Sequence, residues 1–412
     1  MTEKSTKPQL RFAGFDDTWE QRKLGDIVTV YDGVHQTPNY QTSGVMFLSV
    51  ENIATLKSNK FISFEDFKRD YKVYPQRNDI LMTRIGDVGT TNVVTDNDVK
   101  AYYVSLALLK YKETNPFFLS SAIQSDFVQE GLSNRTLKTA IPMKINKDEI
   151  GQVDAMLPTS ADEQDKIGSF FSQLDTLITL HQRKYDKLTN VKKSMLEKMF
   201  PKNGSNVPEI RFKGFSDAWE QRKLSDVATM HARIGWQNLR TSEFLDSGDY
   251  MLITGTDFND GAVNYSTCHF VEKERYEQDK HIQIKNGSIL ITKDGTLGKV
   301  AYVQGLSMPA TLNAGVFNVE IKDETKVDNK YLFQYLKAPF LMDYVDKKAT
   351  GGTIKHLNQN ILVDFPVVMP SKAEQEAIGV YFQQLDNLIT LHQRELEKLK
   401  NLKKACLEKM FV

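Results

Sequence analysis

The chain has 412 residues, of which 40% are hydrophobic and 26% are charged, a composition typical of a folded globular protein with two or three domains. The 53 basic and 53 acidic residues give a formal net charge of zero, which excludes binding to nucleic acid through bulk positive charge. No apolar segment approaches the roughly 20 residues that span a bilayer, and the N-terminus lacks the apolar segment of a secretory signal, so we expect a cytoplasmic protein. The two cysteines, Cys268 and Cys406, have no zinc-binding spacing, so the sequence predicts neither a disulfide nor a metal site.

The chain begins with a segment that it later repeats. Residues 8–27, which contain Trp-Glu-Gln-Arg-Lys-Leu, recur as residues 208–227 with most positions identical. A second block, residues 163–200, recurs as residues 374–411. Because the two copies share only short stretches between these blocks, the sequence predicts one scaffold that occurs twice and carries a different variable region each time.

The variable segments between the repeated blocks have patterns of both strands and helices. In the first copy, residues 45–53 and 79–89 are apolar runs with polar ends, as in strands, and residues 116–132 have helical character. Residues 250–258, 288–298 and 331–345 are their counterparts. We therefore expect an α+β fold, divided into a first variable region (1–161), a first long helix (162–200), a linker (201–207), a second variable region (208–372) and a second long helix (373–412).

The repeated C-terminal block predicts a long amphipathic helix in each copy. Apolar residues recur at alternating spacings of four and three, and no proline interrupts them. Each helix would be on the order of 50 Å long at 1.5 Å per residue. The expected seam consists of Ile167, Phe171, Leu174, Ile178, His181 and Leu188 in the first helix, and Ile378, Phe382, Leu385, Ile389, His392 and Leu399 in the second.

Two arrangements would cover this seam. Each helix can fold onto its own variable region, or the two helices can pair antiparallel around an approximate twofold axis. We favour the pair, since helices of this length need a partner along their whole seam. His181 and His392 then act as polar seam residues that fix the register, rather than as ligands or bases.

A basic residue followed by a glycine-rich turn occurs in both variable regions. Arg84 precedes Gly86 and Gly89 in the first copy, and Lys293 precedes Gly295 and Gly298 in the second, with Lys299 next. Such a turn can present backbone NH groups and a cation to a phosphate. It can equally be a structural turn that needs glycine for positive φ, and we favour this second interpretation.

Polar, basic segments shortly before each long helix are candidate groove-reading loops. Arg, Lys, Asn and Gln are the side chains that contact base edges in DNA. Residues near His35 and Gln36 are possible counterparts, in the first copy, of the segment 233–240. The full set of DNA-binding candidates is Arg84, Asn134, Arg135, Lys138, Lys144, Arg233, Gln237, Arg240, Lys293, Lys299, Lys355 and His356.

Several common catalytic motifs are absent from the sequence. The segment Asn-Pro-Phe-Phe at residues 115–118 lacks the second proline of an amino-methyltransferase motif, and no cofactor loop accompanies it. Residues 295–300 depart from a phosphate-binding loop. There is also no nucleophile elbow, zinc-protease helix or nuclease-type acidic pair. The sequence thus predicts a protein that binds rather than catalyses.

The repeated motifs carry a family resemblance. Two copies of Trp-Glu-Gln-Arg-Lys-Leu, a proline-ended strand, and a helix that begins Glu-Gln-x-x-Ile and continues through Gln-Leu-Asp-x-Leu-Ile-Thr-Leu-His-Gln-Arg resemble the specificity subunit of a type I restriction-modification system. The resemblance covers nearly the whole chain. It implies two target-recognition domains, each reading one half of a bipartite, asymmetric double-stranded DNA site in the major groove.

The same resemblance implies partners and the absence of catalysis in this chain. The helices would set the unread spacer and dock two modification subunits, which use S-adenosylmethionine to methylate adenine. Two restriction subunits that use ATP and Mg²⁺ would join through them, and no cofactor would bind this chain. Two other classes stay open: a tandem protein-binding scaffold, which would lack salt-dependent affinity for DNA, and a methyltransferase fused to its own recognition domains.

Overall fold

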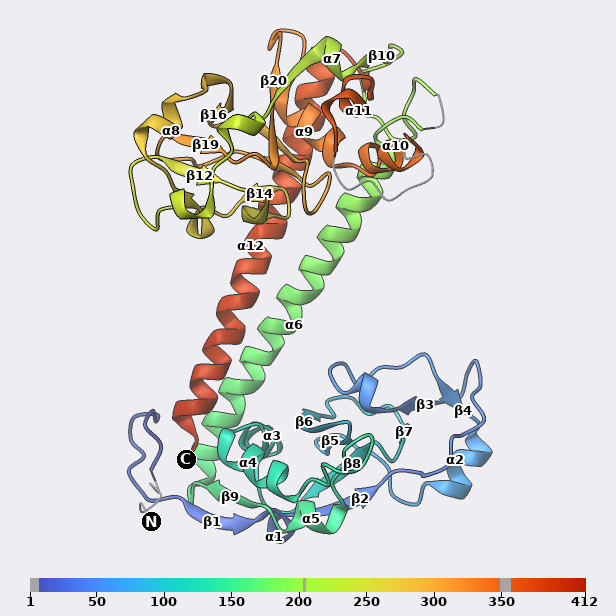
Figure 1. Ribbon diagram of the computed structural model, residues 1–412. Coiled ribbons are helices and arrows are strands. Elements are labelled where there is room, and N and C mark those ends of the chain that lie inside the picture. Colours follow the sequence, from blue (N-terminus) through green and yellow to red (C-terminus); the bar gives the residue numbers. More distant parts are fainter. Residues whose placement is uncertain (1–6, 203–204, 349–356) are drawn as a thin grey trace. The chain divides into compact units, whose positions relative to one another are not determined.

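The computed structural model describes residues 7–202, 205–348 and 357–412. They form two compact units, the first made of the chain up to Arg183 together with Gln393–Val412, and the second of Lys184–His392. The long helices α6 (Ala161–Lys198) and α12 (Lys372–Met410) each contribute to both units (Figure 1). The repeat divides the chain sequentially, whereas packing assigns one part of each long helix to each unit. In the described ranges, every helix is too short or too polar to cross a membrane.

The first unit contains three small sheets. β1 (Glu20–Lys23) pairs with β9 (Asp154–Leu157), and the other two sheets have the strand orders β2-β8-β5-β6 and β4-β3-β7. Their strands are β2 (Val28–Asp32), β3 (Val45–Leu48), β4 (Phe61–Ile62), β5 (Ile80–Ile85), β6 (Asp87–Val93), β7 (Lys100–Tyr102) and β8 (Leu106–Tyr111). The short helices are α1 (Leu24–Ile27), η1 (Val50–Asn52), α2 (Phe64–Asp70), α3 (Pro116–Ile123), α4 (Asp126–Arg135) and α5 (Lys147–Gly151).

The second unit repeats this plan with a larger central sheet. β10 (Glu220–Lys223) pairs with β21 (Pro366–Met369), and the other sheets have the orders β11-β20-β17-β18-β14-β13 and β15-β12-β19-β16. Their strands are β11 (Ala228–His231), β12 (Met251–Ile253), β13 (Phe258–Asn259), β14 (Ala262–Val263), β15 (His269–Phe270), β16 (Gln283–Ile284), β17 (Ile289–Thr292), β18 (Val300–Tyr302), β19 (Ala310–Leu312) and β20 (Val316–Ile321). The short helices are α7 (Leu224–Val227), η2 (Gly235–Gln237), η3 (Thr241–Glu243), η4 (Gly255–Asp257), η5 (Tyr265–Thr267), α8 (Lys273–Glu277), η6 (Lys280–Ile282), α9 (Asn329–Lys337), α10 (Phe340–Lys348) and α11 (Gln359–Val363).

The predicted α+β class is confirmed, with one difference in the helices of the variable regions. The sequence predicts a helical segment at residues 116–132 and another at 331–345, and the structure divides each into two helices, α3 and α4 in the first unit and α9 and α10 in the second. Asn115 caps α3, because its Oδ1 accepts hydrogen bonds from the amides of Phe117 and Phe118. The Asn-Pro-Phe-Phe segment is thus the start of a helix.

The repeated Glu-Gln pair joins each long helix to the rest of its unit. Glu163, which is buried, accepts two hydrogen bonds of 2.6 and 2.7 Å from Arg11 of the opening block. The next residue, Gln164, donates to the carbonyl of Pro158 and accepts from the amide of Asn115. Glu374 and Gln375 make the corresponding contacts in the second unit, with Arg211, Pro370 and Asp328. These contacts explain why the opening block and the start of the long helix occur together in both copies.

The end of each long helix packs against the opening block of the other copy. In the first unit, Phe411 follows α12 and its ring centroid lies 5.9 Å from that of the buried Trp19. In the second unit, Phe200 follows α6 and lies 6.3 Å from Trp219. The amide of Leu10 donates to the carbonyl of Lys409, as that of Ile210 does to Lys198. Each unit is therefore completed by a helix from the other copy.

The predicted seam packs both against the variable region of its own copy and against the other long helix. Ile167 and Phe171 are buried in the first unit in one cluster with Cys406 and Met410 of α12, and Leu174 is also buried. The buried seam residues of the second unit are Ile378, Phe382, Leu385 and Ile389, whereas Ile178, His181, Leu188, His392 and Leu399 are half-buried. Within each unit the two helix segments run antiparallel, which confirms the predicted pair. A register role for the two histidines stays a prediction.

Lysines occupy one seam position in each helix, and each is paired with an aspartate of the other helix. Lys192 of α6 forms an ion pair with Asp386 of α12, and Lys403 of α12 forms one with Asp175 of α6. A glutamine of the variable region joins each pair: Gln334 donates to Asp386 at 2.7 Å, and Gln124 accepts from Lys403 at 3.1 Å. Among the described residues, each unit thus has a lysine–aspartate–glutamine contact at the helix seam.

Candidate nucleic-acid interface

An exposed loop with two lysines, residues 137–144, connects α4 to α5 in the first unit. Its base is closed by Leu137, whose amide donates to the carbonyl of Lys144 at 2.8 Å. The amide of Gly86, in the β5–β6 turn, donates to the carbonyl of Met143. This loop, called here the 137–144 loop, therefore stands on the turn that the sequence singled out.

The side chains of the 137–144 loop combine cations with apolar groups. Lys138 and Lys144 are exposed, and neither forms an ion pair with another residue that the structure describes. Ile141 at the tip is fully exposed, and Leu137 and Met143 are more than two-fifths exposed. Lysines suit phosphates, and exposed apolar side chains suit thymine methyl groups or base steps. The sequence pattern predicted the lysines but not the apolar tip, although the run Ala-Ile-Pro-Met lies between them in the sequence.

Asn134 and Arg135 lie at the end of α4, beside this loop. Both are exposed, and Arg135 donates to Glu149 at 2.9 Å. Both partners of this pair are more than a third exposed, so the ion pair contributes little free energy. Arg135 can therefore exchange Glu149 for a phosphate at little cost. These two residues stay candidates.

Arg84 is placed differently from the expectation of a phosphate contact. Its side chain is buried, forms an ion pair with Asp32 and donates from Nε to the carbonyl of Ile145 at 3.0 Å. These contacts hold β5 to β2 and to the base of the 137–144 loop, which favours a structural role.

The glycines of the turn have different surroundings. Gly89 has φ +99°, and a Cβ there would come within 2.6 Å of the side-chain nitrogen Nε2 of Gln129 on α4. Gly86 has φ +83° and open space around it. Both positions favour glycine for its backbone conformation, and Gly89 also because α4 packs against it.

In the second unit, the two lysines of the equivalent turn differ in their exposure. Lys293 is partly buried, with its Nζ 5.7 Å from the ring centroid of Phe317 and 3.9 Å from Asp294. Lys299 is exposed. The amide of Leu357 donates to the carbonyl of Lys293, as that of Ile145 does to Arg84. The candidates Lys355 and His356 lie outside the described residues.

The segment 233–240 also divides into buried and exposed residues. Arg233 is 2% exposed and donates to the carbonyl of Leu312 at 3.0 Å and to Gln278 at 3.1 Å. Burial lowers the pKa of its guanidinium, as does the charge of Arg275. Gln237 is buried too, whereas Arg240 is exposed. Packing therefore favours a structural role for Arg233 and Gln237 and leaves Arg240 as a candidate for contact with a ligand.

His35 and Gln36 of the first unit line an open cavity of about 570 Å³. Thr37, Asp66 and Arg69 are also part of its wall. Arg69 contacts Asp66 and Asp70, so the cavity is not basic overall. It lies in the region for which the sequence suggested a counterpart of the segment 233–240.

Fold and site together define a doubled α+β binding protein with two unlike loop sets on one helix scaffold. A family described as the type I restriction modification DNA specificity domain matches residues 16–190 and again residues 216–401. The chain therefore belongs to the type I restriction-modification DNA specificity family. Members of this family supply specificity rather than catalysis.

Relatives match over most of their length. The chain is 23% identical to the type I restriction enzyme MjaVIII specificity subunit of Methanocaldococcus jannaschii, over 94% of this chain and 91% of the relative. It is 20% identical to the EcoBI specificity subunit of Escherichia coli, over 96% and 86%. The crystal structure of the type I S subunit from M. genitalium matches with a TM-score of 0.66 at 16% identity, over 98% of this chain and 99% of that chain, which supports the fold.

Proposed function

We propose that this chain is the DNA-binding subunit of a type I restriction-modification complex, and that each unit reads one half of a bipartite, asymmetric site. The observation that carries this proposal is the contrast between the scaffold and the loops. The contacts of Arg11 with Glu163 recur as those of Arg211 with Glu374. The exposed loops on this repeated scaffold differ in sequence, so two unlike half-sites follow.

In the first unit, the 137–144 loop and the neighbouring end of α4 would enter the major groove. Lys138 and Lys144 would neutralise phosphates, which positions the unit without sequence preference. Asn134 and Arg135 are of the types that make bidentate contacts with base edges. In the second unit, Arg240 and Lys299 are the exposed candidates. Lys355 and His356 stay candidates from the sequence alone.

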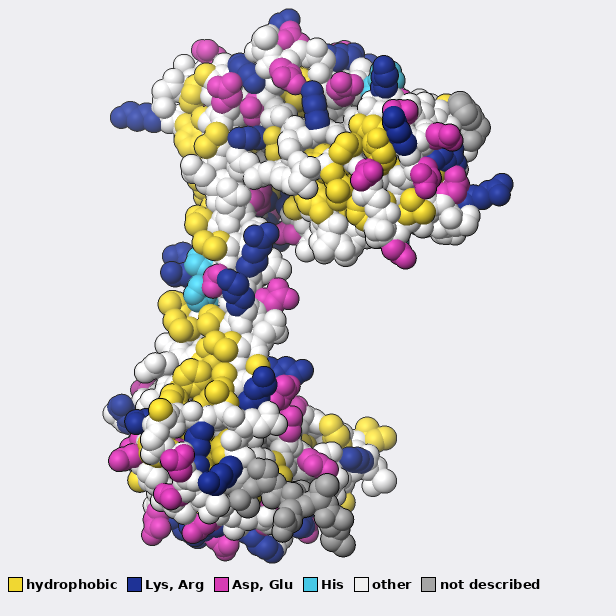
Figure 2. All heavy atoms as spheres, turned by 90° about the vertical axis from the view of Figure 1, so that its left-hand side faces the viewer, with side chains coloured by type: hydrophobic (Ala, Val, Ile, Leu, Met, Phe, Trp, Pro, Cys, Tyr) yellow, Lys and Arg dark blue, Asp and Glu magenta, His cyan; other side chains and the backbone are white. Residues whose placement is uncertain are grey.

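The helix pair would set the spacer between the half-sites and dock the modification subunits. Leu177 and Leu180 of α6 are 44% and 46% exposed, and Leu388 and Leu391 at the equivalent positions of α12 are 44% and 52% exposed. Figure 2 shows hydrophobic side chains on the exposed flank of the long helices. Because the surface occurs once in each unit, it suits two copies of one partner.

The remaining partners and cofactors follow from this assignment. Two modification subunits would bring S-adenosylmethionine and methylate one adenine in each half-site. Two restriction subunits would join through them and use ATP and Mg²⁺. This chain would bind none of these three cofactors and would not catalyse a reaction alone.

An exchange of one variable region tests the proposal. Residues 28–161 are replaced by the same region of another specificity subunit, and the chimera is expressed with its modification subunit. We expect one half of the methylated site to change while the other half is kept. A change in both halves would contradict independent reading by the two units.

A tandem protein-binding scaffold is the alternative function. Binding of a DNA fragment that carries the methylated site, measured at several salt concentrations, distinguishes the two. The proposed function requires affinity that falls steeply as salt rises, because counterions are released on binding. Affinity that does not depend on salt would favour the scaffold.

A further inference from the structure

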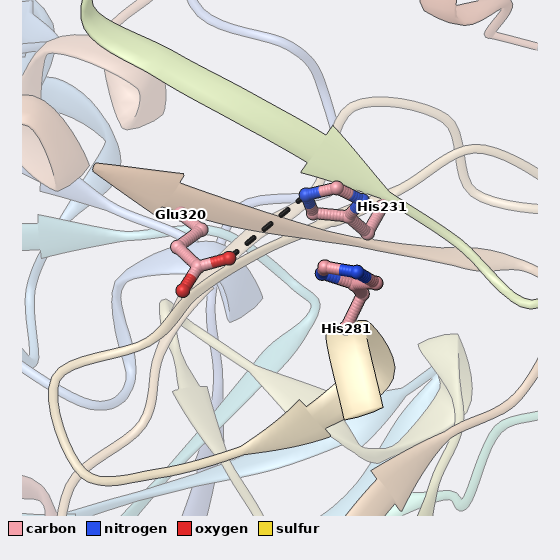
Figure 3. A group of neighbouring side chains, drawn as sticks. All are labelled: His231, His281 and Glu320. Atoms are coloured by element: carbon pink, nitrogen blue, oxygen red, sulfur yellow. Dashed lines mark ion pairs between the residues drawn. The ribbon is translucent and has the colours of Figure 1, made fainter. Parts of the chain in front are cut away.

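Two histidines and a glutamate meet at one edge of the large sheet in the second unit. His231 ends the edge strand β11, Glu320 lies on the neighbouring strand β20, and His281 lies on η6 (Figure 3). One ligand atom from each residue lies within 4.8 Å of the other two. This is the one group of its kind among the residues that the structure describes.

The strand register places these side chains on one face. β11 pairs antiparallel with β20 so that Thr229 lies opposite Glu320 and His231 opposite Asn318. Since side chains alternate along a strand, all four point to the same side of the sheet, while Met230 and Val319 point into the core. The His231 and Glu320 side chains are therefore diagonal neighbours, with Nε2 and Oε2 3.9 Å apart.

The third residue is held over this face by its backbone. The amide of His281 donates to Asp279 at 2.9 Å, and its carbonyl accepts from Asn318 at 3.0 Å. The His281 side chain itself is exposed, and its ring stacks on that of His231 with the centroids 4.4 Å apart. Figure 3 shows a nitrogen-bearing edge of each ring on the side of the Glu320 carboxylate.

We propose that His231, His281 and Glu320 bind one divalent transition-metal ion of the zinc class. Two imidazoles with one carboxylate favour Zn²⁺, Cu²⁺ or Ni²⁺ over Mg²⁺ and Ca²⁺, which prefer oxygen ligands. Three protein ligands would leave the remaining coordination positions to water.

Small side-chain movements bring the three ligands to bonding distance. Ligand atoms in a tetrahedral zinc site lie roughly 3.3 Å apart, given zinc–ligand bonds of about 2.0 to 2.2 Å. The exposed side chains of His281 and Glu320 can close the difference by rotation, which also turns the stacked rings toward a common point. The 3.0 Å hydrogen bond between His231 Nε2 and Thr229 would be exchanged for the metal bond.

The equivalent edge of the sheet in the first unit has different side chains and an ion pair. There Tyr31 and Lys110 occupy the positions of His231 and Glu320 in the paired strands. Lys110 forms an ion pair with Asp79, which precedes β5. A bound ion would give the second unit a comparable link, since it would fasten η6 to the sheet edge. The proposal is independent of the proposed DNA-binding function.

The test uses the full-length chain, freed of metal by a chelator and titrated with Zn²⁺ in equilibrium dialysis. We expect one saturable site per chain, weakened at least about tenfold in H231A, H281A and E320Q. Since His281 is exposed, H281A leaves the core intact, and circular dichroism confirms folding. H269A is the matched control, because His269 lies in the same unit outside the cluster and contacts Phe244 instead; it should bind as the wild type does.

A second readout uses cobalt and local protection. Co²⁺ bound in place of Zn²⁺ should give the visible absorption of a low-coordinate nitrogen and oxygen site in the wild type and not in H281A. Amide exchange in residues 278–284 should slow on addition of Zn²⁺. Absence of saturable binding by the wild type, or unchanged binding in H281A, would overturn the proposal.

Discussion

The ion pair between Lys192 and Asp386 leads to a sharp prediction about the helix seam. Lys192 is 9% exposed and Asp386 is 27% exposed, and Asp386 also accepts from Gln334. Replacing Asp386 by asparagine keeps the shape and leaves a lysine charge in the seam without its counterion. Removing one partner of a buried pair costs 3 to 5 kcal/mol, and the partial exposure of Asp386 reduces this to about 2 to 3 kcal/mol.

The opposite substitution should be far milder. Lys192→Met removes the buried charge and fills the seam with an apolar side chain of similar length, so we expect a change within about 1 kcal/mol. Asp386 remains partly exposed and keeps its bond from Gln334. The seam therefore predicts that the two partners of one ion pair differ strongly in their effect.

The pH dependence follows from the direction of the lysine pKa. Burial lowers the pKa of Lys192 below its usual 10.5, as does the charge of Lys337, and Asp386 counteracts both. In Asp386→Asn the pKa falls further, because that counteraction is lost. Between the folded and unfolded pKa values the unfolded chain binds more protons, so stability rises with pH. The deficit of Asp386→Asn relative to the wild type should thus shrink as pH rises toward the ordinary lysine pKa.

The repeat supplies a matched control. Asp175 pairs with Lys403 in the first unit, but these side chains are 47% and 17% exposed, so Asp175→Asn should cost less than about 1 kcal/mol. The assay is urea unfolding followed by circular dichroism at about pH 7 and about pH 9.5. Equal losses in the two asparagine variants, or a Lys192→Met variant as unstable as Asp386→Asn, would refute the reasoning.

Three further predictions concern the turns, the loop and the helices. In urea titrations, Gly89→Ala should lower the free energy of unfolding by at least about 1 kcal/mol more than Gly86→Ala does. The reason is that Gln129 would lose its hydrogen bonds of 3.0 Å to Gly89 and 2.7 Å to Ile123. Equal losses in the two variants would contradict the packing argument. Lys138→Ala and Lys144→Ala should each weaken DNA binding across sequences and reduce the slope of log affinity against log salt by about one. Replacement of the exposed Lys57 by alanine serves as the control. A loss of affinity confined to one DNA sequence would instead indicate contact with a base. Insertion of a heptad in both long helices, after Arg183 and after Arg394, should lengthen the spacer by about 3 base pairs, since it adds roughly 10 Å. Methylation mapping that returns the original spacer would contradict a spacer set by the length of the helices.

The sequence predicted the scaffold because its signals are periodic and repeated. The heptad spacing of Ile167, Phe171 and Leu174 follows directly from burial of one helix face, and the structure confirms it. The seam lysines were missed, although Lys192 falls on the same spacing, because a charged residue in an apolar series looks like a surface position until its partner is known.

Individual contacts in the variable regions were harder to predict. Arg84 and Arg233 are basic residues next to turns, and sequence alone does not show that Asp32 or the carbonyl of Leu312 engages them. His231, His281 and Glu320 come together through strand pairing and a loop anchor, and no local spacing links them. Contacts between residues far apart in the sequence, rather than local patterns, determine the burial of the two arginines and the grouping of the histidines with the glutamate.

Methylation mapping tests the central claim most directly. The chain is expressed with its modification subunit in a host that lacks other adenine methylation, and methylated adenines are located across the genome. The account predicts one split, asymmetric motif with a fixed unread spacer and one methylated adenine in each half. A continuous or symmetric motif would contradict the claim that two unlike units each read one half of the site.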